Sequence, residues 1–305
     1  MKSAFKIDIQ TNINKIMKQH VKLISGGVVM ACVSLVFSGC TSCISNGRSL
    51  YNSVTPDSSL TERTFVLAPF SSIDSRTVVD VRVSQADDQS VMLSAPTNYL
   101  QYIDVKVKGG VLTISTTKKV NLRKADMILT VTVPELKSVT TSGTGDIDFI
   151  GRFAAGDFRA VTSGTGDIEM KQFEAQRLTL TSSGTGDINY AGLAESASLN
   201  ISGTGDIDLS VDGMKKIDAS TSGTGDIDLK GSAASASFVT SGTGDVNATH
   251  LKAGRVYVQA SGTGDIECYA VDEISGSVSG ISHVKVKGNP PSRHVSGGKK
   301  VRFID

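Results

Sequence analysis

The pentapeptide Ser-Gly-Thr-Gly-Asp occurs seven times without a mismatch in this chain of 305 residues. The steps between successive copies are 21, 20, 19, 20, 19 and 20 residues. A fixed period in this range is typical of a solenoid, in which one coil buries its apolar side only by stacking on the next coil. The copies begin at Ser142, Ser163, Ser183, Ser202, Ser222, Ser241 and Ser261.

Apolar and polar residues alternate on both sides of every pentapeptide. The fifth residue after each Ser is Ile or Val, the seventh is apolar or aromatic, and the third before it is apolar. A period of two indicates strands and not helices. The sequence therefore predicts an all-β fold, a single-stranded parallel β-helix of about 20 residues per coil. All length variation falls after the second strand, as in residues 150–157 and 230–235, where we expect a loop.

The pentapeptide has the composition of a tight corner between two strands. Coils of a β-helix rise about 4.8 Å, so identical residues lie over one another. Gly permits positive φ and close approach of neighbouring backbones, and stacked Thr hydroxyls could form a ladder. Asp in a turn accepts from backbone N–H groups two residues on. We expect a structural turn ladder of Asp146, Asp167, Asp187, Asp206, Asp226, Asp245 and Asp265.

Acidic residues accumulate on the outward face beside this ladder. The residue after the inward Ile is Asp or Glu in five copies, so twelve carboxylates share one face. Unit charges about 5 Å apart repel by roughly 1 kcal/mol in water. Corner N–H groups, neighbouring Lys and Arg, or bound cations should offset this repulsion.

The pentapeptide differs from the Gly-Gly-x-Gly-x-Asp repeat of calcium-binding β-rolls. In that repeat the metal-binding Asp lies two residues after the last Gly, where this chain has an inward Ile or Val. We therefore expect no metal site and no cofactor. Binding of Ca²⁺ along the aspartates stays as a less favoured alternative, because hard oxygen ligands attract such ions.

The regular repeats occupy residues 137–287 of a β-helix domain that we expect over residues 65–287. Residues 65–136 are rich in strand patterns and are expected to form irregular first coils or an N-terminal cap. A degenerate eighth copy begins at Ser279, as is usual for a terminal repeat. Residues 288–305 contain two Pro and a Gly pair and are expected to form a C-terminal cap.

The N-terminal residues resemble a lipoprotein signal peptide, which we assign to residues 1–39. Lys15, Lys18 and Lys22 precede an apolar run over residues 23–37, which is short for a membrane span. Cleavage before Cys40 would leave its thiol for lipid attachment, and residues 40–64 would form a tether. Translation could also start at Met17. We expect an outer-membrane lipoprotein of the cell envelope, on either the periplasmic or the outer side.

The cysteine content and the net charge bear on the core and on the class of partner. Of the cysteines, Cys268 falls in an inward position and is expected to be a small core residue. Formal net charge is +1, so nothing indicates a nucleic-acid partner.

Three segments before the first pentapeptide carry a family resemblance. They are residues 70–73 (Phe-Ser-Ser-Ile), 109–114 (Gly-Gly-Val-Leu-Thr-Ile) and 131–136 (Val-Thr-Val-Pro-Glu-Leu). With the repeats that follow, they resemble the DUF2807 family, labelled as an autotransporter adhesin head or GIN domain and common in Bacteroidetes envelope proteins. The resemblance covers residues 65–305. It implies a right-handed parallel β-helix and a homo-oligomer, specifically a trimer.

The uniformity of the repeats argues against an enzyme. A catalytic site needs acid and base groups in unequal environments, and no pair of carboxylates is singled out here. His250 and His283 are expected to be solvated or capping residues. We therefore expect an adhesin-like scaffold without catalysis that binds an unknown protein or glycan. The alternatives are a periplasmic structural or sensory protein and, less favoured, a β-helix enzyme that acts on polysaccharides.

Overall fold

The computed structural model describes residues 52–117, 120–123 and 125–304. These belong to one compact unit, Ser49–Asp305. The predicted signal peptide, the predicted lipidation site Cys40 and residues 41–51 of the predicted tether lie outside the described residues. Within the described ranges, no helix is long and apolar enough to cross a membrane.

The described residues are mostly strands, with two short 3₁₀ helices. The elements before the first pentapeptide are β1 (Asn52–Val54), β2 (Leu60–Thr64), β3 (Ser72–Arg76), β4 (Asp80–Gln85), β5 (Ser90–Pro96), η1 (Thr97–Tyr102), β6 (Ile103–Lys108), β7 (Val111–Thr116), β8 (Val120–Leu122), β9 (Ile128–Val133) and β10 (Ser138–Thr141). The later elements are β11 (Ile147–Phe149), β12 (Phe153–Thr162), β13 (Ile168–Ser182), β14 (Ile188–Ile201), β15 (Ile207–Thr221), β16 (Ile227–Thr240), β17 (Val246–Ala260), β18 (Ile266–Val278), β19 (Val284–Lys287), β20 (Ser292–Ser296), η2 (Gly298–Lys300) and β21 (Val301–Ile304).

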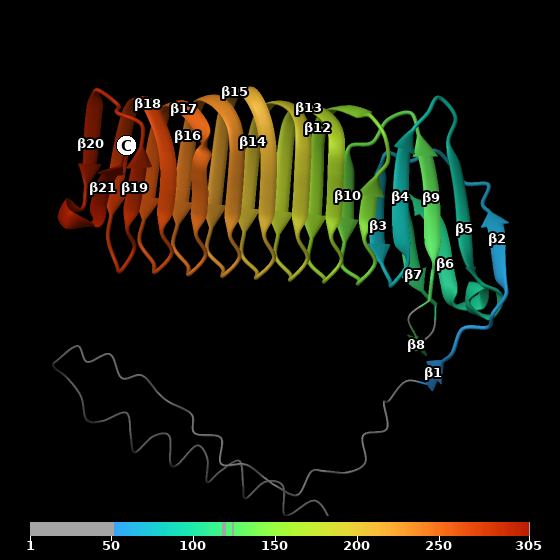
Figure 1. The fold of residues 1–305 in the computed structure, drawn as a ribbon. Helices are drawn as coiled ribbons and strands as arrows, with labels where there is room; N and C mark the ends of the chain where they lie inside the picture. Colours follow the sequence, from blue (N-terminus) through green and yellow to red (C-terminus); the bar gives the residue numbers. More distant parts are fainter. Residues whose placement is uncertain (1–51, 118–119, 124, 305) are drawn as a thin grey trace, which may run out of the picture. The chain divides into compact units, whose positions relative to one another are not determined.

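The repeats form a β-solenoid, which confirms the predicted fold class. Neighbouring coils from β12 to β18 lie side by side and pair in parallel (Figure 1). Like residues are in register, so Ile168 pairs with Ile188, Ile188 with Ile207 and Ile207 with Ile227. The pentapeptides are the corners, and they follow one another along one edge of the stack (Figure 1).

The segment between two corners is one continuous bent strand, and the loop expected there is absent from β13 to β18. Register shifts replace the loop, for example between Met170 and Phe173 and between Val211 and Met214. A bulge absorbs an extra residue while the flanking backbone groups keep their partners in the next coil. The length variation therefore falls at the predicted positions, but it lies inside a strand and not in a loop.

The solenoid interior is a continuous apolar column. The residues three before and five and seven after each Ser are all buried in the seven copies. Bulge residues Phe153 and Phe173 are also buried and join Phe149, Phe158 and Tyr190 in an aromatic cluster. Neighbouring ring centroids in this cluster lie 4.5 to 5.9 Å apart, within the range of favourable aromatic pairs.

Both corner glycines are required by close approach of neighbouring coils and not by backbone conformation. A Cβ on Gly164 would lie 2.0 Å from the carbonyl oxygen of Gly143, and one on Gly205 would lie 2.1 Å from that of Gly186. No pentapeptide glycine has positive φ, so of the two properties of Gly considered from the sequence only close approach is used at these corners. The close approach brings the carbonyl of the first corner Gly within bonding distance of two N–H groups. The first Gly carbonyl accepts from the Thr and the second Gly of the next coil, as Gly143 does from Thr165 and Gly166.

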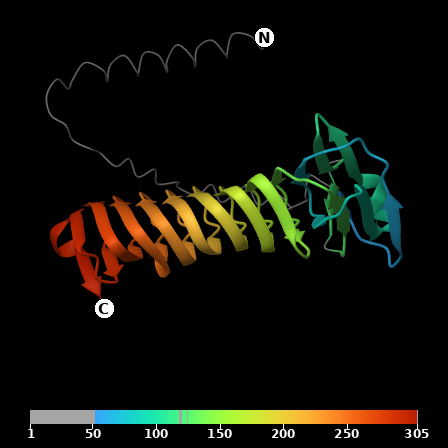
Figure 2. The same ribbon diagram turned by 90° about the horizontal axis from the view of Figure 1, so that it is seen from above.

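A coil without the pentapeptide underlies the first repeat. Strands β3 and β4 pair in parallel with β10 and β11, and residues 76–80 turn the corner between them. In this register Val81 pairs with Ile147, so Asp80 lies next to Asp146. Strands β7 and β9 pair in parallel with β3 and β4, and β2, β5 and β6 add antiparallel strands (Figure 1). Figure 2 shows these blue-to-green segments at the end of the stack opposite the red C-terminal segments. Residues 65–136 thus contain both irregular coils and covering strands.

The segment expected as a C-terminal cap is a further coil. Strand β20 pairs in parallel with β18, and β21 pairs with β19. Arg293 pairs with the inward residue Ile274, and its guanidinium lies 4.0 Å from the ring centroid of Phe303. Arg293 also donates from Nε to the carbonyl oxygen of Pro290 at 3.0 Å. A charged side chain thus covers the apolar column at this coil.

We predict that Gly203→Ala destabilises the stack, because its Cβ would lie 2.1 Å from the carbonyl oxygen of Gly184. Overpacking of this kind costs roughly 1–3 kcal/mol, so the thermal midpoint should fall by several degrees. Gly156→Ala is the matched control, because a Cβ there meets nothing within 4 Å. Equal midpoints for the two variants would contradict the close-approach explanation.

Candidate functional site: the aspartate ladder and the acidic row

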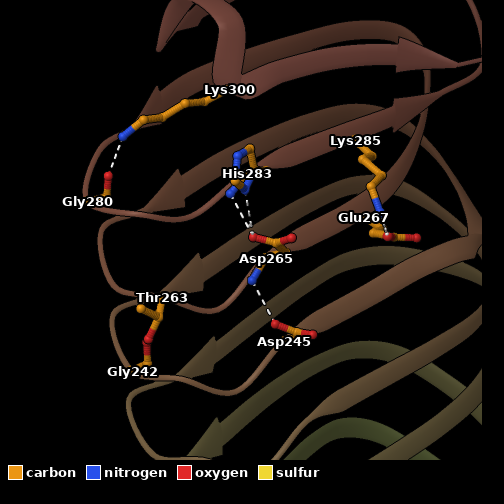
Figure 3. A network of polar contacts seen from close by, with 9 residues as sticks. All are labelled: Gly242, Asp245, Thr263, Asp265, Glu267, Gly280, His283, Lys285 and Lys300. Atoms are coloured by element: carbon orange, nitrogen blue, oxygen red, sulfur yellow. Dashed lines mark hydrogen bonds and ion pairs between the residues drawn. The ribbon is translucent and has the colours of Figure 1, made fainter.

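The aspartates of the pentapeptides form a hydrogen-bonded column along the corners. The backbone N–H of each Asp donates to Oδ1 of the Asp one coil earlier, as Asp206 does to Asp187 at 2.8 Å. The column starts at Asp80, which accepts from Asp146 at 3.1 Å, and ends where Asp265 accepts from the N–H of His283 at 2.7 Å (Figure 3). We call this column the Asp ladder. Its members are Asp80, Asp146, Asp167, Asp187, Asp206, Asp226, Asp245 and Asp265.

The Asp side chain substitutes for a backbone acceptor at the corner. The carbonyl oxygen of each ladder Asp accepts from the inward residue of the coil before it, as Asp187 does from the N–H of Ile168 at 2.9 Å. Each coil is therefore tied to the next by one backbone bond and one side-chain bond at the same residue. The sequence predicted that each Asp accepts from an N–H two residues on. The structure shows instead that the donor lies one whole coil further along the chain.

The Thr of the pentapeptide does not form the expected hydroxyl ladder. Its side chain is exposed in all seven copies, and Thr263 donates to the carbonyl oxygen of Gly242 at 3.4 Å (Figure 3). A second hydroxyl column lies inside the corner and was missed from the sequence. Each member donates to the carbonyl oxygen of the second corner Gly, at 2.9 to 3.2 Å, and satisfies it in the interior. These buried residues are Thr141, Thr162, Ser182, Thr221 and Thr240.

A second row of acidic residues runs parallel to the Asp ladder. Its positions follow the inward Ile or Val, and we call them the acidic row. In register order they are Asp148, Glu169, Asn189, Asp208, Asp228, Asn247 and Glu267. Two asparagines divide the row, so carboxylates are direct neighbours only as Asp148–Glu169 and Asp208–Asp228. Asn247 also donates from Nδ2 to Oδ1 of Asp228 at 2.8 Å.

Charge repulsion remains within each neighbouring pair. Partial burial and the charge of Asp228 raise the pKa of Asp208, although Lys230 opposes the shift. Partial burial and the charge of Glu169 likewise raise the pKa of Asp148. In the ladder, partial burial raises the pKa of Asp226, and the N–H that it accepts from Asp245 lowers it.

Basic residues close the acidic row at both ends. Arg82 of β4 pairs in register with Asp148 and lowers its pKa. Lys285 of β19 pairs in register with Glu267, and its ammonium group forms an ion pair with that carboxylate (Figure 3). Offsetting charge thus comes from N–H donors in the ladder and from cations around the row, two of the sources expected from the sequence.

A hollow of about 430 Å³ lies on the acidic row. The row contributes Glu169, Asn189, Asp208 and Asp228 to its lining, and Lys171 and Lys230 also line it. Among the described residues, no group of three or more His, Cys, Asp or Glu side chains converges as metal ligands would. Oδ1 of each ladder Asp already accepts an N–H.

The irregular histidines do not line this hollow, although His250 pairs in register with Lys230, which does. His250 is exposed and contacts the hydroxyl of its neighbour Thr249. Nδ1 of His283 lies 3.5 Å from Oδ1 of Asp265 at the end of the ladder. Burial raises the pKa of the Cys268 thiol to about 12, so this core residue is held as an unreactive thiol. The lipidation site predicted at Cys40 lies outside the described residues.

The fold and the ladder define a parallel β-solenoid with an acidic outer face. The family described as "Putative auto-transporter adhesin, head GIN domain" (DUF2807) matches residues 69–211 and 194–290. The chain belongs to this family. No curated protein matches the chain.

Several solved structures share the fold at low sequence identity. One described as a putative adhesin from Bacteroides fragilis is 23% identical, with 82% of this chain and 97% of that chain covered and a TM-score of 0.54. Another putative adhesin, from Parabacteroides merdae, is 18% identical, with 83% and 100% covered and a TM-score of 0.66. One described as a putative lipid binding protein, from Parabacteroides distasonis, is 18% identical, with 83% and 100% covered and a TM-score of 0.63. The family supports a non-catalytic, adhesin-like or binding role at the cell envelope or surface.

We predict that Asp206→Ala weakens the stack because the N–H of Asp226 loses its acceptor. Loss of a hydrogen bond to a charged group costs roughly 1.5–3 kcal/mol, so the urea midpoint should fall. Asp206→Asn retains an oxygen at the same place and should keep the wild-type midpoint. If both variants unfold at the same urea concentration, the ladder bond is not what stabilises the corner.

A second prediction concerns pH. Because the pKa of Asp208 is raised in the folded state, its contribution to stability is present below the ordinary value of 3.8 and is lost as pH rises through the raised pKa. Asp208→Asn should therefore raise the thermal midpoint at pH 7 and leave it unchanged near pH 3.

The opposite change provides the control for this prediction. Asn189→Asp would join the two acidic pairs into one run of five carboxylates and should lower the midpoint at pH 7 only. Midpoint differences that do not change between pH 3 and pH 7 would exclude an electrostatic origin.

Proposed function

We propose that the chain is a lipid-anchored, non-catalytic scaffold of the cell envelope whose outer faces bind a protein or glycan. The observation that supports this most directly is the Asp ladder. It holds outward side chains in rows at the spacing of stacked coils, about 4.8 Å. Such rows present similar chemistry many times on a rigid support, as solenoid binding surfaces do.

The outward carboxylates favour binding over hydrolysis. Glycoside hydrolysis needs one protonated and one ionised carboxyl group flanking the bond to be cleaved. The carboxylates of the acidic row instead stand side by side on one surface, and Asn189 and Asn247 separate them into similar groups. This arrangement suits contacts repeated along a partner.

The lipid anchor is proposed from the sequence of the N-terminal residues. We expect Cys40→Ala to release the protein from the membrane fraction, because the thiol that would carry the lipid is removed. Cys43→Ala is the matched control and should stay in the membrane fraction. Metabolic labelling with an alkyne fatty acid should mark the wild type and Cys43→Ala but not Cys40→Ala. Retention of the label by Cys40→Ala would contradict the anchor.

The side of the outer membrane on which the protein lies distinguishes a binding scaffold from a periplasmic structural or sensory protein. We expect an amine-reactive, membrane-impermeant biotin reagent to label the protein on intact cells. A periplasmic protein in the same culture is the control and should stay unlabelled. If labelling of our protein requires outer-membrane permeabilisation, the adhesin-like proposal fails and the periplasmic alternative replaces it.

A further inference from the structure

The outer columns reverse their charge in the last two described coils. In the ladder column, Asp265 is followed by His283, whose N–H donates to it. In the acidic row, Glu267 pairs in register with Lys285, and Lys285 pairs with Arg302. The same two columns thus change from acidic to basic within one coil (Figure 3).

The surrounding sequence contributes cations and no acids. Between Ser279 and Ile304 there is neither Asp nor Glu, and the next acid is Asp305, which lies outside the described residues. The same segment contains six Lys and Arg residues and two His. We call this surface the basic end. Its cations are Lys285, Lys287, Arg293, Lys299, Lys300 and Arg302.

Three of these cations form contacts with other residues of the fold. Lys285 pairs with Glu267, and Lys300 donates to the carbonyl oxygen of Gly280 (Figure 3). Arg293 lies over Phe303 and donates to Pro290.

The other three cations of the basic end have no carboxylate partner among the described residues. They are Lys287, Lys299 and Arg302, and the last two are exposed. Arg302 stands directly beside Lys285, and like charges at such neighbouring strand positions destabilise a sheet. A cap that only neutralised the acidic row would need Lys285 and not a second basic layer. The surplus positive charge points to an anionic partner.

The apolar side chains favour a soluble polymer over a bilayer. Insertion into a membrane interface needs apolar residues that project freely. Phe303 is 38% exposed, but its ring lies under the guanidinium of Arg293, and Ile304 is 39% exposed. Val295 and Val301 pack against the core. Ile281, in the corner before β19, is 69% exposed. Two exposed isoleucines on separate elements are few for insertion, whereas Lys285 and Arg302, paired across β19 and β21, suit a polymer with repeated negative charges.

We propose that the basic end is a binding site for an anionic polysaccharide, whose carboxylate or sulfate groups contact Lys287, Lys299 and Arg302. This proposal rests on the proposed binding function and names a ligand class for one end of the scaffold. It also gives the solenoid two surfaces of opposite sign, the acidic row and the basic end.

The test measures binding of the purified protein to alginate, a polyuronate, at low salt and at physiological salt. We expect wild type to bind at low salt and more weakly as salt rises, because salt screens such contacts. Lys287→Gln, Lys299→Gln and Arg302→Gln combined should weaken binding about tenfold or more. The control combines Arg159→Gln, Lys252→Gln and Arg255→Gln, which removes the same net charge from β12 and β17. Circular dichroism and the thermal midpoint verify that both variants fold.

The outcomes separate this site from the general function. Equal loss of binding in both triple variants would overturn the site, because only net charge would matter. Absence of alginate binding by wild type would also overturn it, and so would binding confined to phosphatidylglycerol vesicles, which would make the partner a membrane. Surface labelling on intact cells is independent of these results, so the adhesin-like proposal can survive the loss of the basic end.

Discussion

The structure depends on one repeated interaction, the contact between corner backbones of successive coils. Corner carbonyls approach the next coil so closely that only glycine fits, with a Cβ on Gly203 or Gly223 reaching 2.1 Å from an oxygen. At the same corner, each ladder Asp accepts from the N–H of the next coil. Glycine permits the approach and aspartate satisfies the N–H that results. The two residue types are therefore one requirement, which explains why both Gly and the Asp are unchanged in all seven copies.

Close stacking also places like charges next to one another, and residues of the outer surface reduce the resulting repulsion. Like residues lie over like residues, so any acidic position becomes a row of carboxylates. The ladder carboxylates are stabilised by backbone N–H groups, but among the described residues no backbone N–H donates to a carboxylate of the acidic row. Its repulsion is limited by Asn189 and Asn247 and by Arg82 and Lys285 at its ends. Partial burial, together with the remaining repulsion, raises the pKa values of Asp148 and Asp208.

Much of this fold could be predicted from the sequence, because identical pentapeptides at a nearly fixed period indicate directly which residues pair in neighbouring coils. The repeat period gave the length of one coil, and the alternation of apolar and polar residues identified the inward positions from Ile147 to Ile266. Three features were beyond the pattern. Asp80 is the first member of the ladder and ends the segment Arg-Thr-Val-Val-Asp, which shares only its Asp with the pentapeptide. Its place in the ladder becomes evident only from the pairing of Val81 with Ile147 in the structure. The buried column headed by Thr141 also contains Ile201 and Ala260, so its hydroxyl role is hidden in the sequence. The donors to the ladder carboxylates lie 18 to 21 residues away beyond Asp80, which local turn chemistry does not anticipate.

The coil that contains Arg293 has a consequence for assembly. A β-solenoid is a template, since the outer edge of one winding offers hydrogen bonds to any strand of matching length. Here an inward position that is apolar in the preceding coils contains a guanidinium, which lies over Phe303. A foreign strand that extended the stack beyond this coil would bury that charge without a counter-ion, at a cost of several kcal/mol. A cation placed where the hydrophobic column would otherwise continue therefore disfavours pairing of a further strand along β20.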